Sequence, residues 1–224
     1  MRAELWAGVR AELPLALGAV PFGLIYGVLA REAGIPPAAA VAMSSIVFAG
    51  SAQFIGTQLF ATGAPGALIL LTTSFVNLRH LLYSASLAPF LRGLRAGWRW
   101  LLGYLLTDEA YAVTVTHYQI RSETDRHKHW FFLGAGLTLW TGWQVSTVLG
   151  VLLGAAVPTS WGLEFALPVI FIAITVPMLT DRPMRAAALV AAVVAVLAAG
   201  APSRIGLMGG ALAGIAAGLL ADRR

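Results

Sequence analysis

The chain has 224 residues, of which 58% are hydrophobic and only 11% carry a charge. Soluble domains are about 25% charged, so a chain this poor in charge cannot build a water-facing surface, and lipid must cover much of it. The 15 basic residues form no stripe suited to nucleic acid, and the absence of cysteine excludes disulfides and thiolate metal sites. The composition therefore predicts an integral membrane protein in a lipid bilayer.

The N-terminal part of the sequence is a short polar lead, Met1 to Glu12, followed by an apolar run, Leu13–Ala30. A cleaved signal peptide is the alternative, but more apolar runs follow, so we interpret this one as an uncleaved first span. Pro21 predicts a kink in it. Gly23 and Gly27 form a pair of small residues that lets another helix approach closely.

The second apolar run, residues 38–60, is long enough to cross a bilayer, which takes about 20 apolar residues. Its middle is polar, and the stretch from Gly50 through Ser51 to Gln53 predicts a break in the helix. Backbone groups freed at such a break would bind a polar ligand at mid-depth. The alternative is close helix packing, with Gln53 bonded to a neighbouring helix. We expect this break to lie near Asn77.

The third run, residues 65–91, carries Asn77, Arg79 and His80 near its centre. An Arg at the middle of a span costs about 2.5–3.5 kcal/mol on insertion scales, so a partner and a function are expected for it. Arg79 lies roughly 18 Å from either end of the run, which makes snorkelling to the interface awkward. We predict that Arg79 faces the interior and contacts a carboxylate, although a snorkelling Arg79 remains the alternative.

Residues 98–120 are ambiguous, because an apolar start is followed by the adjacent acids Asp108 and Glu109. Two carboxylates in a membrane segment must be paired, protonated or wetted. We predict that one stays ionised against Arg79 and that the other binds and releases a proton. Glu109 lies on another helix face than Asp108, where we expect a basic partner. The alternative leaves both acids in water at the membrane surface.

The rest of the sequence is a polar stretch followed by four more apolar runs, so we predict an all-α integral membrane bundle with some helices kinked or broken. The runs are residues 130–157, 161–180, 184–200 and 204–221. Glycines at four-residue spacing predict a close-contact face in the last run. They are Gly206, Gly210, Gly214 and Gly218.

Span count and orientation depend on whether residues 98–120 cross the membrane. The apolar lengths favour eight spans with cytoplasmic termini, and the Lys and Arg distribution favours seven spans with the N-terminus outside. We prefer eight runs, with residues 98–120 partial or broken as the alternative. We interpret residues 1–224 as a single transport domain. A faint likeness between residues 1–120 and 130–224 hints at related halves, as is common among transporters.

Transport fits these residues better than catalysis does. The sequence has no nucleophile or metal motif, so we expect neither an enzyme nor a cofactor. A small zwitterion would suit the polar groups, with Arg79 for its carboxylate and Asp108 or Glu109, helped by Gln53 and Asn77, for its ammonium. A pore built from several copies is a further alternative, and the oligomeric state stays open.

Four short motifs, in order, resemble the AzlC family of branched-chain amino acid permeases, which is named for azaleucine resistance. They are PFG at 21–23, FAGSAQF at 48–54, NLRHLLY at 77–83 and LTDEAY at 106–111. The resemblance extends from about residue 13 to 180. It implies a multi-pass protein of the bacterial inner membrane that exports leucine, isoleucine or valine with a small membrane partner of the AzlD type.

The resemblance does not assign roles to single residues, so the predicted site rests on physical inference. The predicted substrate-binding residues are Gly50, Ser51, Gln53, Asn77, Arg79 and His80, and the predicted proton-coupling residues are Asp108 and Glu109. Two other functions stay open: a membrane scaffold subunit that transports nothing, and a transporter of another small apolar solute.

Overall fold

The computed structural model describes residues 1–120, 127–154, 176, 179–200 and 205–222. All the regular elements in these ranges are α-helices, as the sequence predicts. The chain forms two compact units, Met1–Trp161 and Gly162–Arg224. A single transport domain with related halves stays a prediction, and nearly all of the sixth predicted run, 161–180, lies outside the described residues.

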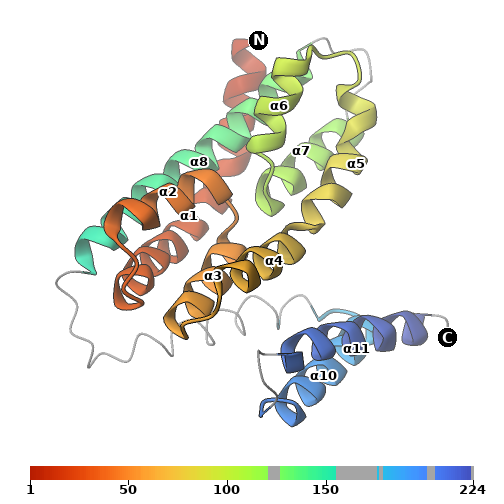
Figure 1. Cartoon of the computed structure of the whole chain (residues 1–224). Helices are drawn as coiled ribbons and strands as arrows, with labels where there is room; N and C mark the ends of the chain where they lie inside the picture. The colour runs from red at the N-terminus through yellow and green to blue at the C-terminus, as the bar shows by residue number, and fades with distance from the viewer. Residues whose placement is uncertain (121–126, 155–175, 177–178, 201–204, 223–224) are drawn as a thin grey trace. The chain divides into compact units, whose positions relative to one another are not determined.

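Two long helices form the core of the first unit (Figure 1). They are α1 (Arg2–Glu32) and α8 (Lys128–Leu153), and both are long and apolar enough to cross a membrane. They pack in parallel through small residues, since Gly8 lies against Phe131 and Gly27 against Val151. The predicted close approach at Gly27 is therefore confirmed. Residues 1–12, predicted as a separate polar lead, form the first turns of α1.

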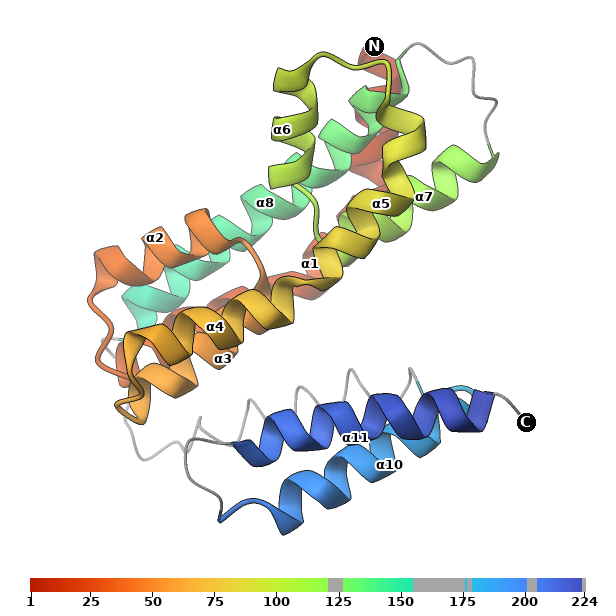
Figure 2. The same cartoon turned by 45° about the vertical axis from the view of Figure 1, so that its right-hand side comes forward.

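Six shorter helices complete the first unit. They are α2 (Pro37–Val47), α3 (Gly50–Ala61), α4 (Gly66–Asn77), α5 (Arg79–Leu91), α6 (Ala96–Tyr104) and α7 (Asp108–Ile120). Figure 2 shows α4 and α5 following one another end to end, with a break at Leu78.

Helices α2 and α3 form a hairpin that enters the bundle and turns back. The helix breaks at Phe48, which has a left-handed φ of 39°, just before the predicted break at Gly50. Tyr26 of α1 contacts both arms of the hairpin. Its hydroxyl donates to the Ala40 carbonyl oxygen of α2 at 2.9 Å, and its ring meets Phe54 of α3 edge-on. The two arms therefore lie at the same level of α1.

Helices α6 and α7 form a second hairpin, which enters from the opposite end. Trp98, near the start of α6, packs against Trp130 with ring centroids 5.1 Å apart. Tyr118, near the end of α7, donates its hydroxyl to the Lys128 carbonyl oxygen at 2.9 Å. Both ends of this hairpin thus lie beside the first turn of α8, whereas Tyr26 and the α2–α3 hairpin lie toward the other end of the bundle.

These hairpins show that neither residues 38–60 nor residues 98–120 form one continuous helix along the bundle, so the predicted seven or eight spans are not confirmed. A half-helix of about 12 residues is roughly 18 Å long, about half the thickness of a bilayer core. In the described part of the first unit, the helical paths that run from end to end are α1, α4–α5 and α8. Length alone does not distinguish a run that crosses from one that turns back.

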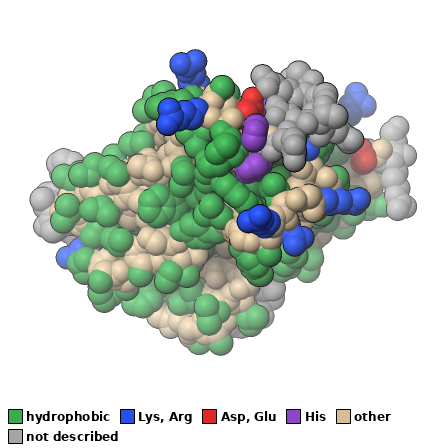
Figure 3. Space-filling model, turned by 90° about the horizontal axis from the view of Figure 1, so that it is seen from above, with side chains coloured by type: hydrophobic (Ala, Val, Ile, Leu, Met, Phe, Trp, Pro, Cys, Tyr) green, Lys and Arg blue, Asp and Glu red, His purple; other side chains and the backbone are tan. Residues whose placement is uncertain are grey.

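Large apolar side chains cover much of the face seen in Figure 3. Leu71 of α4, Leu82 of α5 and Trp100 of α6 are 70%, 72% and 81% exposed. Water would not favour such a surface, whereas lipid tails or another apolar helix would.

The second unit contains an antiparallel pair, α10 (Arg182–Leu197) and α11 (Ile205–Asp222). Asp181 caps α10 by accepting a hydrogen bond from the Met184 amide at 2.8 Å. The predicted glycine face of α11 is confirmed as a contact within the chain, because Gly210 and Gly214 both pack against Ala191 of α10.

We expect Gly27→Leu to destabilise the α1–α8 core. A Cβ at Gly27 would lie 2.5 Å from the backbone nitrogen of Val151, and backbone cannot move aside as a flexible side chain can. Overpacking costs about 1–3 kcal/mol, so the thermal unfolding midpoint in detergent should fall by at least about 3 °C. Gly18→Leu is the matched control, since nothing lies within 4 Å of its Cβ position. Equal midpoints for the two variants would contradict this packing.

Candidate functional site

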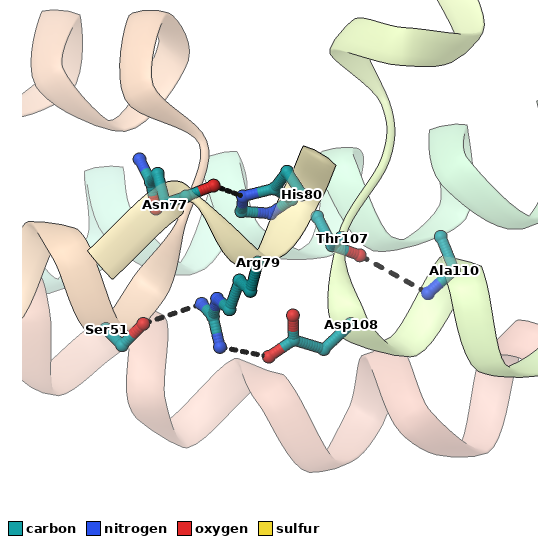
Figure 4. Close-up of polar contacts among 7 residues, drawn as sticks. All are labelled: Ser51, Asn77, Arg79, His80, Thr107, Asp108 and Ala110. Atoms are coloured by element: carbon teal, nitrogen blue, oxygen red, sulfur yellow. Dashed lines mark hydrogen bonds and ion pairs between the residues drawn. The ribbon is translucent and has the colours of Figure 1, made fainter. Parts of the chain in front are cut away.

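Arg79 joins the tips of the two hairpins (Figure 4). It is the first residue of α5, at the break in the α4–α5 path. Its Nη1 forms an ion pair with Oδ2 of Asp108, the first residue of α7. Its Nη2 donates to the Ser51 hydroxyl of α3 at 2.6 Å. The predicted contact of Arg79 with a carboxylate is thus confirmed, and three interrupted helical segments meet at one guanidinium.

Helices α3 and α7 both begin beside Arg79, and the first turn of a helix favours negatively charged groups. Asp108 lies in the first turn of α7, where the helix dipole stabilises a negative charge. The Thr107 hydroxyl accepts a hydrogen bond from the Ala110 amide at 3.3 Å and so caps the same helix. On the other hairpin, Ser51 lies in the first turn of α3, whose leading amides lack intrahelical partners. Both tips therefore present the positive ends of their helices near Arg79.

One hydrogen-bond donor and one acceptor at this site are left over. Arg79 Nε and Asp108 Oδ1 are buried and have no hydrogen-bond partner among the described residues. The two side chains as a whole are 31% and 40% exposed, so the pair is not sealed within the first unit. A cationic donor beside an anionic acceptor is chemically complementary to a carboxylate and an ammonium group carried by one small molecule.

Gly50 and Gln53 hold the α2–α3 tip against α8. A Cβ added at Gly50 would lie 2.9 Å from Cη2 of Trp143. Gln53 is fully buried, and its Oε1 accepts a hydrogen bond from Trp143 Nε1 at 3.1 Å. This contact is the interhelical bond considered as an alternative for Gln53. Sequence reasoning did not connect Trp143 with the site.

Asn77 and His80 lie at the same break but point away from Arg79 (Figure 4). His80 Nδ1 hydrogen-bonds to the Asn77 carbonyl oxygen at 3.1 Å, and its ring meets Tyr83 edge-on. The Asn77 Oδ1 is buried without a partner among the described residues. Of the predicted residues, the structure thus brings Ser51, Arg79 and Asp108 together, and it leaves Gln53, Asn77 and His80 outside this contact.

Glu109 forms no ion pair with a basic side chain among the described residues, and the basic group that acts on it electrostatically is Arg79, the partner of Asp108. Glu109 interacts with the Thr107 hydroxyl, and its neighbour across the helix interface is a second acid, Glu12 of α1. Further along the interface, Glu4 of α1 pairs with His117 of α7, with Oε2 and Nε2 3.1 Å apart. The structure therefore adds two acids and a histidine to the polar groups predicted from the sequence.

A spacing signal in the first residues could have identified these acids. Glu4, Gly8, Glu12 and Ala16 recur every four residues, which places them on one face of a helix. The structure buries all four. The interpretation of residues 1–12 as a polar lead concealed this pattern. A segment that lies in water is not expected to have a buried helix face.

An apolar helical bundle in which two hairpins and a broken helix meet at a charged pair is consistent with a membrane protein, because broken helices and charged groups are tolerated at membrane depth only where protein or a cavity surrounds them. The sequence pattern of the AzlC protein family matches residues 14–157, from α1 to beyond α8. The chain belongs to this family, as its motifs predict.

Relatives of the chain carry names consistent with this class. An uncharacterized membrane protein of Archaeoglobus fulgidus is 30% identical over 211 residues, which is 92% of this chain and 90% of the relative. The inner membrane protein YgaZ of Escherichia coli is 28% identical over 175 residues, or 75% and 71% of the two chains. The branched-chain amino acid transport protein AzlC of Bacillus subtilis is 28% identical over 179 residues, or 77% and 68%. No solved structure matches the chain.

Proposed function

We propose that this protein is a secondary transporter that exports branched-chain amino acids such as leucine, isoleucine and valine. The observation that carries the proposal is the unused donor and acceptor at the Arg79–Asp108 pair. Arg79 Nε would bind the carboxylate of the amino acid, with help from the first amides of α3. Asp108 Oδ1 would bind its ammonium group. In a bilayer, the break in each helical segment would supply these polar groups at mid-depth, where an unbroken helix offers none.

Two sources support the substrate class and the partner. The Bacillus subtilis relative is named as a branched-chain amino acid transport protein. The family resemblance adds a small AzlD-type membrane protein as the partner. Exposed apolar side chains on α4 and α5, such as Leu71 and Leu82, offer a surface for either that partner or lipid.

We further propose a multi-pass location in the bacterial inner membrane with the start of α1 at the cytoplasmic side. Basic residues gather at the end of the first unit where α1 and α8 begin. They include Arg2, Arg92, Arg95, Arg99 and Lys128. At the opposite end, where α1 ends, Arg31 is the basic residue among those that the structure describes. Positively charged loops favour the cytoplasm, so this asymmetry supports the orientation.

Proton coupling would divide the two adjacent acids between two tasks. Asp108 would stay ionised because it pairs with Arg79. Glu109, which lacks an ion-pair partner among the described residues, would take up and release the proton. In an outward-moving antiporter, the proton would enter the cell as the amino acid leaves.

Labelled leucine or valine exchange in proteoliposomes, with and without the AzlD-type partner, tests the proposal. Wild-type protein should exchange external labelled substrate for internal unlabelled substrate, and an imposed pH gradient should drive net accumulation. Glu109→Gln should lower the ratio of gradient-driven uptake to exchange by at least about fivefold, because the proton carrier is gone. Glu32→Gln, at the exposed end of α1, serves as the matched control.

A scaffold function is the second candidate, and polar bonds between helices favour it. Ser44 of α2 hydrogen-bonds to Thr147 of α8 at 3.1 Å, and Ser45 donates to Gln144 at 3.1 Å. Such bonds stabilise a bundle without any solute. If no exchange of leucine or valine occurs even with the partner present, the scaffold function is the better account.

A further inference from the structure

Glu12 is the least solvent-exposed acid in the described part of the chain. The residue is 0% exposed, and both of its carboxyl oxygens lack a hydrogen-bond partner among the described residues. An ionised carboxylate without a donor or a counter-ion is strongly disfavoured in an apolar interior. Gly8 and Ala16 lie on the same face of α1, one turn away from Glu12 on either side. Because this face packs through small uncharged residues, its packing does not require an acid at position 12. A proton held by Glu12 would remove the charge.

Among the charged groups on the helices that pack around Glu12, Glu109 is the one that interacts with it most strongly. Helices α2, α3, α7 and α8 pack against α1. From α7, Glu109 interacts with Glu12, and the His117–Glu4 pair lies further along the same interface. Helices α2 and α3 contain no Asp, Glu, Lys, Arg or His, and α8 has its two basic residues in its first turn, beside the start of α1. On α1 itself, Arg10 is exposed.

Acidic and basic groups of α1 and α7 meet at two levels of their interface. The two helices are antiparallel, because Glu12 interacts with Glu109 whereas Glu4 pairs with His117. Eight residues separate these two levels on each helix, or about 12 Å. Between the two levels in the sequence of α7 is Thr114, which is 0% exposed and whose hydroxyl has no partner among the described residues. Buried polar groups without a protein partner commonly hydrogen-bond to buried water.

We infer that Glu12 is a proton-binding residue that exchanges a proton with Glu109 and passes it along the α1–α7 interface toward His117 and Glu4. The inference rests on the proposed function of Glu109 and extends it with a second carboxyl group and a route to the end where α1 begins. In each step the O–H or N–H bond of the donor group breaks as a new O–H or N–H bond forms on the acceptor group. The proton is the only species transferred, and no further reactant is required.

Infrared spectroscopy of the whole protein in lipid tests the first part, because protonated carboxylic acids absorb separately from carboxylates. We expect the wild type at neutral pH to show a carboxylic acid band, and Glu12→Gln to lose the intensity of one group. Glu32→Gln, the exposed acid at the other end of α1, should leave the band unchanged. A Glu12→Gln spectrum identical to that of the wild type would overturn the inference.

A second variant leaves Glu12 in place, so the test survives if Glu12→Gln does not fold. Removing the charge of Glu109 in Glu109→Gln should let Glu12 ionise more readily, which shifts the pH midpoint of its band downward. An unshifted midpoint would contradict the exchange between the two acids. This readout is independent of transport and stays decisive even if the protein does not carry leucine.

The route itself is tested in proteoliposomes. Glu12→Gln should lower the ratio of pH-driven uptake to exchange of labelled leucine by at least about fivefold, as Glu109→Gln does. His117→Phe, which keeps the ring that stacks on Phe131, should lower the same ratio because it removes the proton-binding nitrogens. A wild-type ratio in both variants would overturn the route while leaving the proposed transport of amino acids intact.

Discussion

Arg79→Gln should reduce leucine exchange by at least about 30-fold. Truncating one member of a hydrogen-bonded charge pair costs about 2–5 kcal/mol. Asp108 is 40% exposed, so water screens the pair, and the low end of that range, which corresponds to about 30-fold, is the appropriate expectation. The substrate loses its carboxylate ligand, and Asp108 loses its counter-charge at the same time. Initial rates, normalised to the amount of protein in the vesicles, measure the effect.

A double variant without either charge distinguishes two roles of the Arg79–Asp108 pair: binding the substrate, and holding the two hairpin tips together. Arg79→Gln with Asp108→Asn leaves no unpaired charge between the two hairpin tips. If the pair only holds the tips together, this variant should recover both stability and exchange, because coupled residues show non-additive effects. If Arg79 and Asp108 bind the amino acid, stability should recover and exchange should not. Recovery of wild-type exchange would therefore refute the substrate-binding role, and Arg10→Gln, exposed on α1, controls for the loss of one positive charge.

Gly50→Leu should reduce leucine exchange by at least about tenfold while leaving membrane insertion intact. The added side chain would overlap Trp143 of α8, whose Cη2 lies 2.9 Å from the Cβ position. Relieving that overlap displaces either the Trp143 ring, which holds Gln53 of the same hairpin, or the tip of the hairpin itself. Both changes disturb the position of Ser51, the hydrogen-bond partner of Arg79. Overpacking costs of about 1–3 kcal/mol are large enough for the expected effect.

Gly66→Leu is the matched control for Gly50→Leu. Both glycines are the first residue of a helix, α4 and α3 respectively, but nothing lies within 4 Å of a Cβ at Gly66. We expect near wild-type exchange in the control. Wild-type rates in Gly50→Leu as well would mean that the close contact of this tip with α8 has no role in transport.

Several features of the fold and site follow from local chemistry alone. The scarcity of charge predicts a lipid-covered helical protein, and glycine spacing predicts the contacts of Gly27 and Gly214. Arg79 in the middle of an apolar run requires a carboxylate, and Asp108 occupies the only other interrupted run with acids near its centre. Each of these inferences depends on the cost of one group in an apolar environment, and that cost can be estimated without knowing where the rest of the chain lies.

The remaining features depend on direction and on contacts between distant segments. Residues 38–60 and 98–120 have the length of a span, but only tertiary contacts reveal that each run turns back. Tyr26 contacts both arms of the first hairpin, and Trp98 and Tyr118 place both ends of the second hairpin beside the first turn of α8. Likewise, in the sequence Glu12 is one of several acids near the N-terminus. Only the structure shows that α1 extends through it and that α7 packs against it. By itself, the sequence determined that this is a helical AzlC-family protein with charged groups inside apolar runs. Tertiary structure decided which of those groups meet, because a chain reversal changes the partners of every residue beyond it without changing hydropathy or length.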